Sequence, residues 1–219
     1  MSSFSRDRKS GILDRAFFIP GDDMIARLFF SILLLTSVAA CASGARSGAM
    51  TASITEATVI SDTSSLKKAI TVGEVTGGSE TNPLWTSEVG SPEFQTALEQ
   101  SLMLNAMYEA GKPKYRLDAK LLDVDQPIMG LDLTVDSHVF YRLAEAGSDE
   151  LVYETEISCS YTANFSDAFL GVERLRLANE GSMKKNISLF IEALVAEFKK
   201  RDAISAEPDS TEVPGGAAS

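Results

Sequence analysis

Apolar and polar side chains alternate along three segments in the second half of this 219-residue chain, residues 115–125, 131–143 and 151–163. Such alternation predicts β-strands with one buried and one solvated face. In the first segment the apolar phase shifts at Leu122, which predicts a β-bulge. Residues 69–75 alternate in the same way and predict one more strand. Because each strand has a single apolar face, we expect an antiparallel sheet of about four strands, covered on one side.

Two segments with apolar residues at helical spacing predict the helices that cover this sheet. The first begins at Ser91-Pro92-Glu93, where serine can cap, proline suits the first turn and an acid favours the helix dipole. For the second, Ser182 is the expected cap, and a shorter helical stretch over residues 169–178 leads into it. Its apolar face comprises Met183, Ile187, Phe190, Ile191, Leu194 and Phe198. The order β-α-β-β-β-α predicts an α+β fold, a two-layer sandwich with two helices on one face of the sheet.

A short apolar run stands well before these elements. Residues 28–35 are apolar, follow the singly charged segment 24–27 and lead into Val38-Ala39-Ala40-Cys41. The run is far shorter than the ~20 residues needed to cross a bilayer and fits a cleaved export signal. The four residues ending at Cys41 resemble the lipobox of bacterial lipoproteins, with valine where leucine is commonest. This resemblance implies signal cleavage between Ala40 and Cys41 and attachment of acyl chains, such as palmitate, to Cys41.

The lipobox resemblance also implies a location. Ala42 follows the cysteine, where an aspartate would retain many lipoproteins in the inner membrane. We therefore expect the outer membrane, with the lipid-anchored domain facing the periplasm. Secretion without a lipid on Cys41 is the alternative. Residues 1–23 are polar and charged, and we interpret them as an extension upstream of a true start at Met24, the alternative being an unusually long n-region.

Composition divides the rest of the chain. After the signal peptide, residues 24–40, we expect a lipidated flexible tether over residues 41–65, which are rich in Ala, Ser, Gly and Thr. Residues 66–200 form the predicted α+β domain, and residues 201–219 a disordered tail. Five of the 20 Lys and Arg and four of the 31 Asp and Glu precede Cys41, which leaves 15 bases, 27 acids and a net charge of −12. Such a charge argues against nucleic acid as a partner.

Candidate chemistry is sparse, and we predict no enzyme, no catalytic residue, no metal site and no cofactor. Serine and lysine have the S-x-x-K spacing of penicillin-binding enzymes at Ser182 and Lys185 and again at residues 65–68, but no companion motif follows. The single histidine, His138, falls on the polar face of its strand. Cys159 is expected to be a buried, inert thiol. Acidic residues that could meet across strands to hold calcium are Asp118, Asp123, Asp125, Asp132 and Asp136.

The lipobox, the helix from Pro92, the long hairpin and the last helical segment, residues 175–194, together resemble small outer-membrane lipoproteins of proteobacteria, the YajG-type group. More loosely, they are similar to the lipoprotein of lipopolysaccharide assembly. The resemblance implies a non-enzymatic accessory module of the cell envelope that binds an envelope protein or peptidoglycan, and we expect the exposed sheet face or edge to be its contact surface. The alternative is a lipid-binding auxiliary subunit of an envelope lipid or lipopolysaccharide transport system, with an apolar groove lined by Phe94, Leu98, Phe190 and Phe198.

Overall fold

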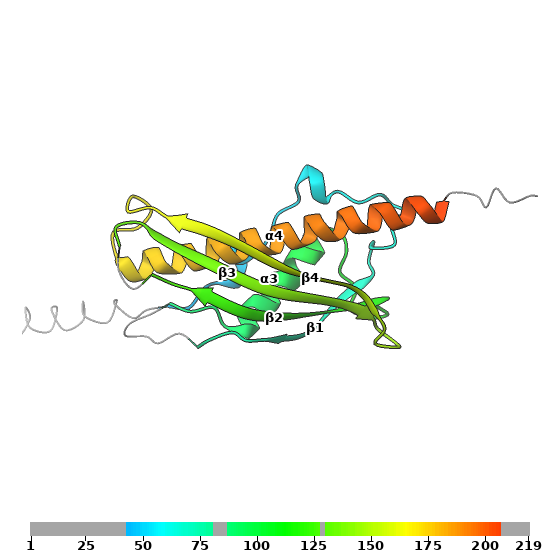
Figure 1. Cartoon of the computed structure of the whole chain (residues 1–219), viewed down its shortest axis with the longest axis horizontal. Coiled ribbons are helices and arrows are strands. Elements are labelled where there is room, and N and C mark those ends of the chain that lie inside the picture. The colour runs from blue at the N-terminus through cyan, green and yellow to red at the C-terminus, as the bar shows by residue number, and fades with distance from the viewer. Residues whose placement is uncertain (1–42, 81–86, 128–129, 207–219) are drawn as a thin grey trace, which may run out of the picture. The chain divides into compact units, whose positions relative to one another are not determined.

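The computed structural model describes residues 43–80, 87–127 and 130–206, and the predicted signal peptide, Ala40 and Cys41 lie outside these ranges. Figure 1 shows a sheet with helices on one of its faces. In chain order the elements are α2 (Ser47–Met50), the 3-10 helix η2 (Glu56–Thr58), β1 (Ile70–Thr76), α3 (Ser91–Leu104), β2 (Tyr115–Asp125), β3 (Leu133–Glu145), β4 (Leu151–Ala163) and α4 (Gly171–Ala206). The α+β class and the order of the predicted elements are confirmed.

The sheet has the order β1-β2-β3-β4 and is mixed, so the expectation of a purely antiparallel sheet was wrong. β2 pairs with β3, and β3 with β4, in antiparallel ladders, whereas β1 pairs with β2 in parallel. The reason lies in the connection: α3 carries the chain from the end of β1 back to the start of β2, and a helical crossover joins parallel strands. The bulge is confirmed, because the β2–β3 register shifts between Leu121 and Asp123.

One continuous helix, α4, runs from Gly171 to Ala206, and the predicted break at residue 182 is absent. Ser182 is fully buried inside this helix and caps nothing. Gly181 stands in its middle because the ring of Tyr161 on β4 lies against it: a Cβ at residue 181 would fall 2.4 Å from the Cδ1 atom of that ring. The described ranges contain no helix of the length and apolarity that a membrane span requires.

The core lies between the sheet and its helices. α4 packs along β3 and β4, and α3 packs on β1 (Figure 1). The ring of Tyr141 on β3 stacks on Phe190 of α4, with the ring centroids 4.0 Å apart. The predicted apolar face of α4 is confirmed, because its members are all buried: Met183, Ile187, Phe190, Ile191, Leu194 and Phe198. Leu131 departs from the expected pattern, since it precedes β3 and is 74% exposed.

The structure contradicts the flexible tether for residues 43–65. Met50 of α2 is fully buried in the main core, with Ala45 and Ala52 beside it in the chain. Arg46 donates from Nε to Glu180 Oε1 of α4 at 2.9 Å, and its backbone N–H donates to the same oxygen at 3.0 Å. Composition suggested disorder because small residues bury little area individually, but here they fit the narrow space beside α3 and α4. At the other end α4 extends to Ala206, into the expected tail.

Met50→Ala tests whether residues 43–65 are part of the folded domain. Because Met50 is fully buried, we expect the free energy of unfolding to fall by about 2–5 kcal/mol, measured by urea denaturation. Ile54→Ala is the matched control, since Ile54 is 57% exposed and its truncation should change stability by no more than ~0.5 kcal/mol. Equal stability of the two variants would instead support a flexible tether over residues 43–65.

Candidate functional site

The face of the sheet that the helices leave uncovered carries mostly polar side chains. We call it the outer sheet face. Its side chains are half-buried or exposed, as the alternation in the sequence predicted, and they are Arg116, Asp118, Lys120, Thr134, Asp136, His138, Phe140, Arg142, Glu154, Glu156, Ser158, Ser160 and Thr162. Basic, acidic and hydroxyl side chains therefore lie together on one face of the sheet.

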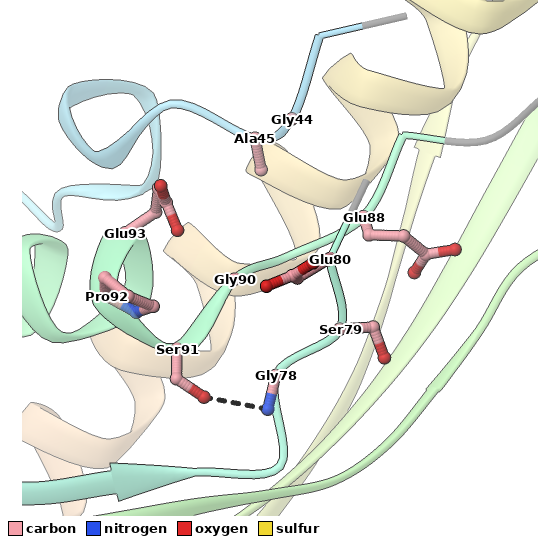
Figure 2. A pocket seen from close by; sticks show the side chains of 10 residues that line it. All are labelled: Gly44, Ala45, Gly78, Ser79, Glu80, Glu88, Gly90, Ser91, Pro92 and Glu93. Carbon is pink, nitrogen blue, oxygen red and sulfur yellow. Dashed lines mark hydrogen bonds between the residues drawn. The ribbon is translucent and has the colours of Figure 1, made fainter. Parts of the chain in front are cut away.

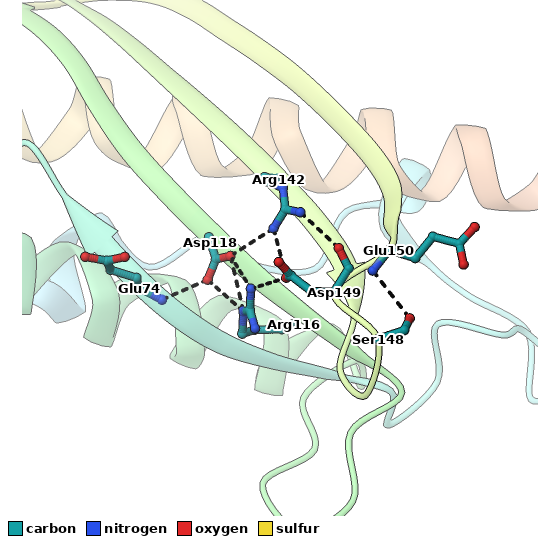
Figure 3. A network of polar contacts seen from close by, with 7 residues as sticks. All are labelled: Glu74, Arg116, Asp118, Arg142, Ser148, Asp149 and Glu150. Carbon is teal, nitrogen blue, oxygen red and sulfur yellow. Dashed lines mark hydrogen bonds and ion pairs between the residues drawn. The ribbon is translucent and has the colours of Figure 1, made fainter.

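Two arginines and two aspartates form a network at one end of the outer sheet face (Figure 3). Arg116 donates from Nε to both carboxylate oxygens of Asp118 at 3.2 Å. Arg142 donates from Nη1 to Asp149 Oδ1 at 3.1 Å and from Nη2 to the carbonyl oxygen of Asp149 at 3.0 Å. Arg116 also pairs with Asp149, and Arg142 Nη1 lies 3.6 Å from Asp118 Oδ2. Because Asp149 lies in the β3–β4 turn, the network ties this turn to the sheet. The two positive and two negative charges cancel, so the network has no net charge to attract a ligand.

The network also needs a glycine on the neighbouring strand. A Cβ at Gly73 of β1 would lie 2.2 Å from Asp118 Oδ1, and the amide of Glu74 donates to that oxygen at 2.9 Å. Hydrogen bonds from Arg142 and then from Arg116 lower the pKa of the Asp149 carboxyl from its ordinary value. Any stability that this pairing supplies is thus present above the ordinary pKa and is lost as the pH falls through the lowered one.

The remaining polar candidates do not gather into a site. His138 Nδ1 lies 2.8 Å from Ser158 Oγ and 3.9 Å from Glu156 Oε1, at the surface as predicted. Of the five aspartates considered for calcium, Asp118 belongs to the arginine network, and Asp132 Oδ1 accepts the amide of Phe165 at 2.9 Å. Over the described part of the chain, no three acidic, histidine or cysteine side chains come together as metal ligands would.

A polar cluster lies buried between the sheet and α4, and Ser182, the serine of the S-x-x-K motif, belongs to it. Ser182 Oγ donates to Ser137 Oγ at 2.8 Å, whereas Lys185 Nζ turns outward to the carbonyl of Ser160 at 3.0 Å. The two members of the motif therefore do not meet. In the second motif, Ser65 Oγ donates to Asp202 Oδ1 at 2.7 Å.

Other members of this cluster complete its hydrogen bonding. Tyr141 OH donates to Asn186 Oδ1 at 2.8 Å, and Asn186 Nδ2 donates to the carbonyl of Ile157 at 2.9 Å. Burial raises the pKa of Tyr141 well above its ordinary value, so the phenol stays a neutral donor. Cys159 is free and half-buried, less enclosed than expected, with Sγ 3.5 Å from Ser137 Oγ. The sequence did not predict that Tyr141 and Asn186 belong to a buried polar cluster. In the sequence, a strand tyrosine and a helix asparagine of this kind cannot be told from ordinary residues of those elements.

The outer edge of β4 is one of the two open margins of the sheet. β4 is a 13-residue strand at the margin of the sheet, and no strand in the described ranges pairs with that edge. The carbonyl of Ser160 accepts Lys185 Nζ and so points away from β3. Since the N–H and C=O of one strand residue point to the same side, the amide of Ser160 faces outward as well. Such an edge can receive another extended chain.

The four side chains that the lipid-transport alternative placed in an apolar groove do not line one. Phe94, Leu98 and Phe190 are fully buried and Phe198 is 2% exposed, and all four belong to the main core. The groove expectation was therefore wrong: these side chains contact one another and the sheet instead of lining a space.

A hollow of about 500 Å³ lies at the start of α3 (Figure 2). The helix begins after Gly90, which occupies the capping position without a side-chain bond, so the serine predicted as the cap has another role. Ser91 Oγ accepts the amide of Gly78 at 2.9 Å. Glu80, Glu88 and Glu93 line the hollow, and their charge opposes the anion that a helix N-terminus attracts. We assign no ligand to it.

Comparisons with known proteins bear only on the shape of the chain. No protein-family model and no curated protein matches the sequence. A Xanthomonas campestris protein of the DUF330 family is similar in structure over 64% of this chain and 92% of its own, with 7% identity and a TM-score of 0.47. A predicted lipoprotein from Caulobacter crescentus matches over 51% and 85%, with 12% identity and a TM-score of 0.39. A minor lipoprotein from Acinetobacter baumannii matches over 62% and 92%, with 10% identity and a TM-score of 0.35.

At these values the similarities carry no functional argument. Two of the three proteins are described as lipoproteins. The resemblance of the sequence to YajG-type or lipopolysaccharide-assembly lipoproteins stays a prediction.

Arg142→Gln tests the network on the outer sheet face. Loss of the guanidinium removes the first cause of the low Asp149 pKa, so we expect that pKa to rise toward its ordinary value in a carboxyl NMR titration. Lys120→Gln is the control, because Lys120 lies on the same face of β2 and outside the network. An Asp149 pKa that does not respond to Arg142→Gln would disprove the pairing.

Proposed function

We propose that this chain is a lipid-anchored lipoprotein of the bacterial envelope that works by binding and not by catalysis. The observation that supports this most is the lipobox-like segment Val38-Ala39-Ala40-Cys41, which ends two residues before Ser43, whose Oγ accepts a hydrogen bond from α4. Signal cleavage before Cys41 and acylation of its thiol and new amino group anchor the protein through fatty chains, each stabilised by about 0.8 kcal/mol per buried CH2. Ala42 favours the outer membrane, with the domain in the periplasm.

The polar outer sheet face and the open β4 edge are the proposed contact surfaces. Main-chain groups on an edge strand give affinity for an extended segment, and side chains of alternate residues give selectivity. Here those alternate residues include Glu154 and Glu156 beside Ser158 and Ser160. An envelope protein with an extended, basic segment fits this edge better than peptidoglycan, because backbone pairing needs a peptide strand.

The geometry favours binding over an enzymatic role. The two arginines and two aspartates of the network on the outer sheet face pair with one another, and the serine of the S-x-x-K motif is buried away from its lysine. The lipid-transport alternative gains no observation, since its proposed groove is closed core.

Cys41→Ser tests the anchor. We expect the variant to leave the outer-membrane fraction, because without the thiol no diacylglycerol can be attached, while the circular dichroism and unfolding midpoint of the domain stay unchanged. Cys159→Ser is the matched control and should remain with the outer membrane, since Cys159 lies on β4 of the folded domain, with its Sγ near Ser137 of β3 and Ser182 of α4. Mass spectrometry of the mature N-terminus gives the lipid directly. A Cys41→Ser protein that stays in the outer membrane would refute lipid anchoring.

Ser160→Pro tests the β4 edge. Proline removes the outward amide of Ser160 without touching the β3–β4 ladder, because edge strands tolerate proline on their open side. With full-length lipoprotein crosslinked in cells, we expect the captured envelope partner to fall with Ser160→Pro and to stay with Ser160→Ala, which keeps the amide. Thermal unfolding of both variants verifies that the fold survives. Equal capture by the two variants would place the partner elsewhere.

A further inference from the structure

Four large apolar side chains lie exposed at the end of the sheet where α4 begins. Leu131 is 74% exposed, Phe165 46%, Phe169 84% and Leu170 57%. They come from the segment before β3 and from the connection between β4 and α4, and we call them the loop patch. Single exposed apolar residues are common, but four of them in two adjoining loops, two with aromatic rings, indicate a surface that contacts a membrane or another molecule.

The loop patch is held in place by one buried arginine. Arg174 is 5% exposed and lies over the ring of Phe165, with its guanidinium carbon 5.2 Å from the ring centroid. It donates from Nη1 to the carbonyl of Ala168 at 2.7 Å and from Nη2 to the carbonyl of Gly130 at 3.2 Å. The rings of Phe165 and Phe169 meet edge to face, 6.1 Å apart. The two loops are therefore joined, and the exposed side chains have a defined position.

The start of the described chain lies at this same end of the domain. Arg176, in the second turn of α4, donates from Nη1 to Ser43 Oγ at 3.0 Å. Figure 1 shows the start of α4 and the connection from β4 at one end of the sheet, and the β3–β4 turn at the other. Cys41 precedes Ser43 by two residues, and two residues of chain span about 7 Å at most. A lipid carried by Cys41, as proposed above, would therefore be attached to the chain within about 7 Å of Ser43.

We propose that the loop patch inserts into the headgroup region of the membrane in which Cys41 is anchored. This inference rests on the lipidation of Cys41 in the proposed function. Aromatic rings favour the boundary between headgroups and acyl chains. Since the acyl chains already hold the domain at the surface, the patch needs little affinity of its own to stay engaged, as for any second contact on a short linker.

The charges around the loop patch indicate which headgroups it meets. Asp132 and Asp167 lie beside it, and their carboxylates accept the amides of Phe165 at 2.9 Å and of Asn164 at 2.8 Å. Acidic side chains near the membrane disfavour anionic lipids. The patch therefore fits a leaflet rich in zwitterionic phosphatidylethanolamine, and its attachment relies on apolar burial instead of on basic residues.

This placement sets the direction of the rest of the molecule. α4 has 36 residues, and at 1.5 Å per residue it extends about 54 Å from the loop patch. The β3–β4 turn and the Arg116–Asp118–Arg142–Asp149 network lie toward the far end of the sheet, away from the lipid (Figure 1). The edge of β4 that no described strand pairs with then runs outward from the membrane.

Depth-dependent quenching of tryptophan tests the proposal on the full lipidated chain. In a Trp85→Phe background, Phe169→Trp places a reporter in the loop patch, and Ile204→Trp places a matched reporter near the other end of α4, where residue 204 is 73% exposed. The protein is reconstituted in phosphatidylethanolamine-rich vesicles with phosphatidylcholine brominated near the headgroup end of its chains. We expect emission from Phe169→Trp to fall about twofold and that from Ile204→Trp to stay unchanged.

Two measurements on the same samples separate this proposal from the proposed function. Mass spectrometry of the N-terminus and flotation with the vesicles report lipidation. If Cys41 is acylated and the protein floats, but residue 169 is no more quenched than residue 204, the loop patch faces water or a protein partner and the inference is overturned while the anchor stands. If Cys41 carries no lipid, both are overturned. Both substitutions are at exposed positions, so unchanged unfolding curves are expected.

Discussion

The close packing of α4 along β3 and β4 is the contact on which the rest of the structure depends. Two features make it specific. Gly181 lets the Tyr161 ring lie directly on the helix, and the buried hydrogen bonds among Ser137, Tyr141, Ser182 and Asn186 permit one register of helix on sheet. An apolar stripe alone could slide along the sheet, whereas a buried amide or phenol that loses its partner costs about 1–3 kcal/mol. The same helix is long enough to link both ends of the domain.

Residues 43–65 depend on α4 in turn. Glu180 is almost fully enclosed and accepts both the side chain and the backbone amide of Arg46, and Met50 enters the core. A segment that composition marks as a tether is thereby part of the domain, and the distance between the predicted lipid and the folded protein shrinks to two residues. Under the proposed lipidation of Cys41, this short connection keeps the domain close to its membrane.

The inner face of the sheet is covered by the helices, and the arginines and aspartates at one end of the outer sheet face pair with one another. The β4 edge, the outer sheet face and the loop patch differ in what they can contact: a peptide backbone, polar groups and lipid headgroups, respectively. They belong to different parts of one rigid unit, so membrane contact and partner binding need not compete. The proposed contacts of this chain therefore differ mainly in where they lie on the domain.

The sequence by itself determined the strands, their two faces, the bulge beyond Leu121 and the lipobox-like segment at Cys41, because alternation, helical spacing and short motifs are local along the chain. Tertiary structure alone decided what non-local contacts control. These include the parallel pairing of β1, the position of β4 at the edge, the burial of Ser182 and Met50, and the joining of two loops by Arg174. No spacing rule could reveal them, since each depends on which distant segment fills the space beside a residue. In the sequence, the small residues of 43–65 look like a linker and Ser182 looks like a helix cap. Only the packing of neighbouring elements shows that they are part of the folded domain.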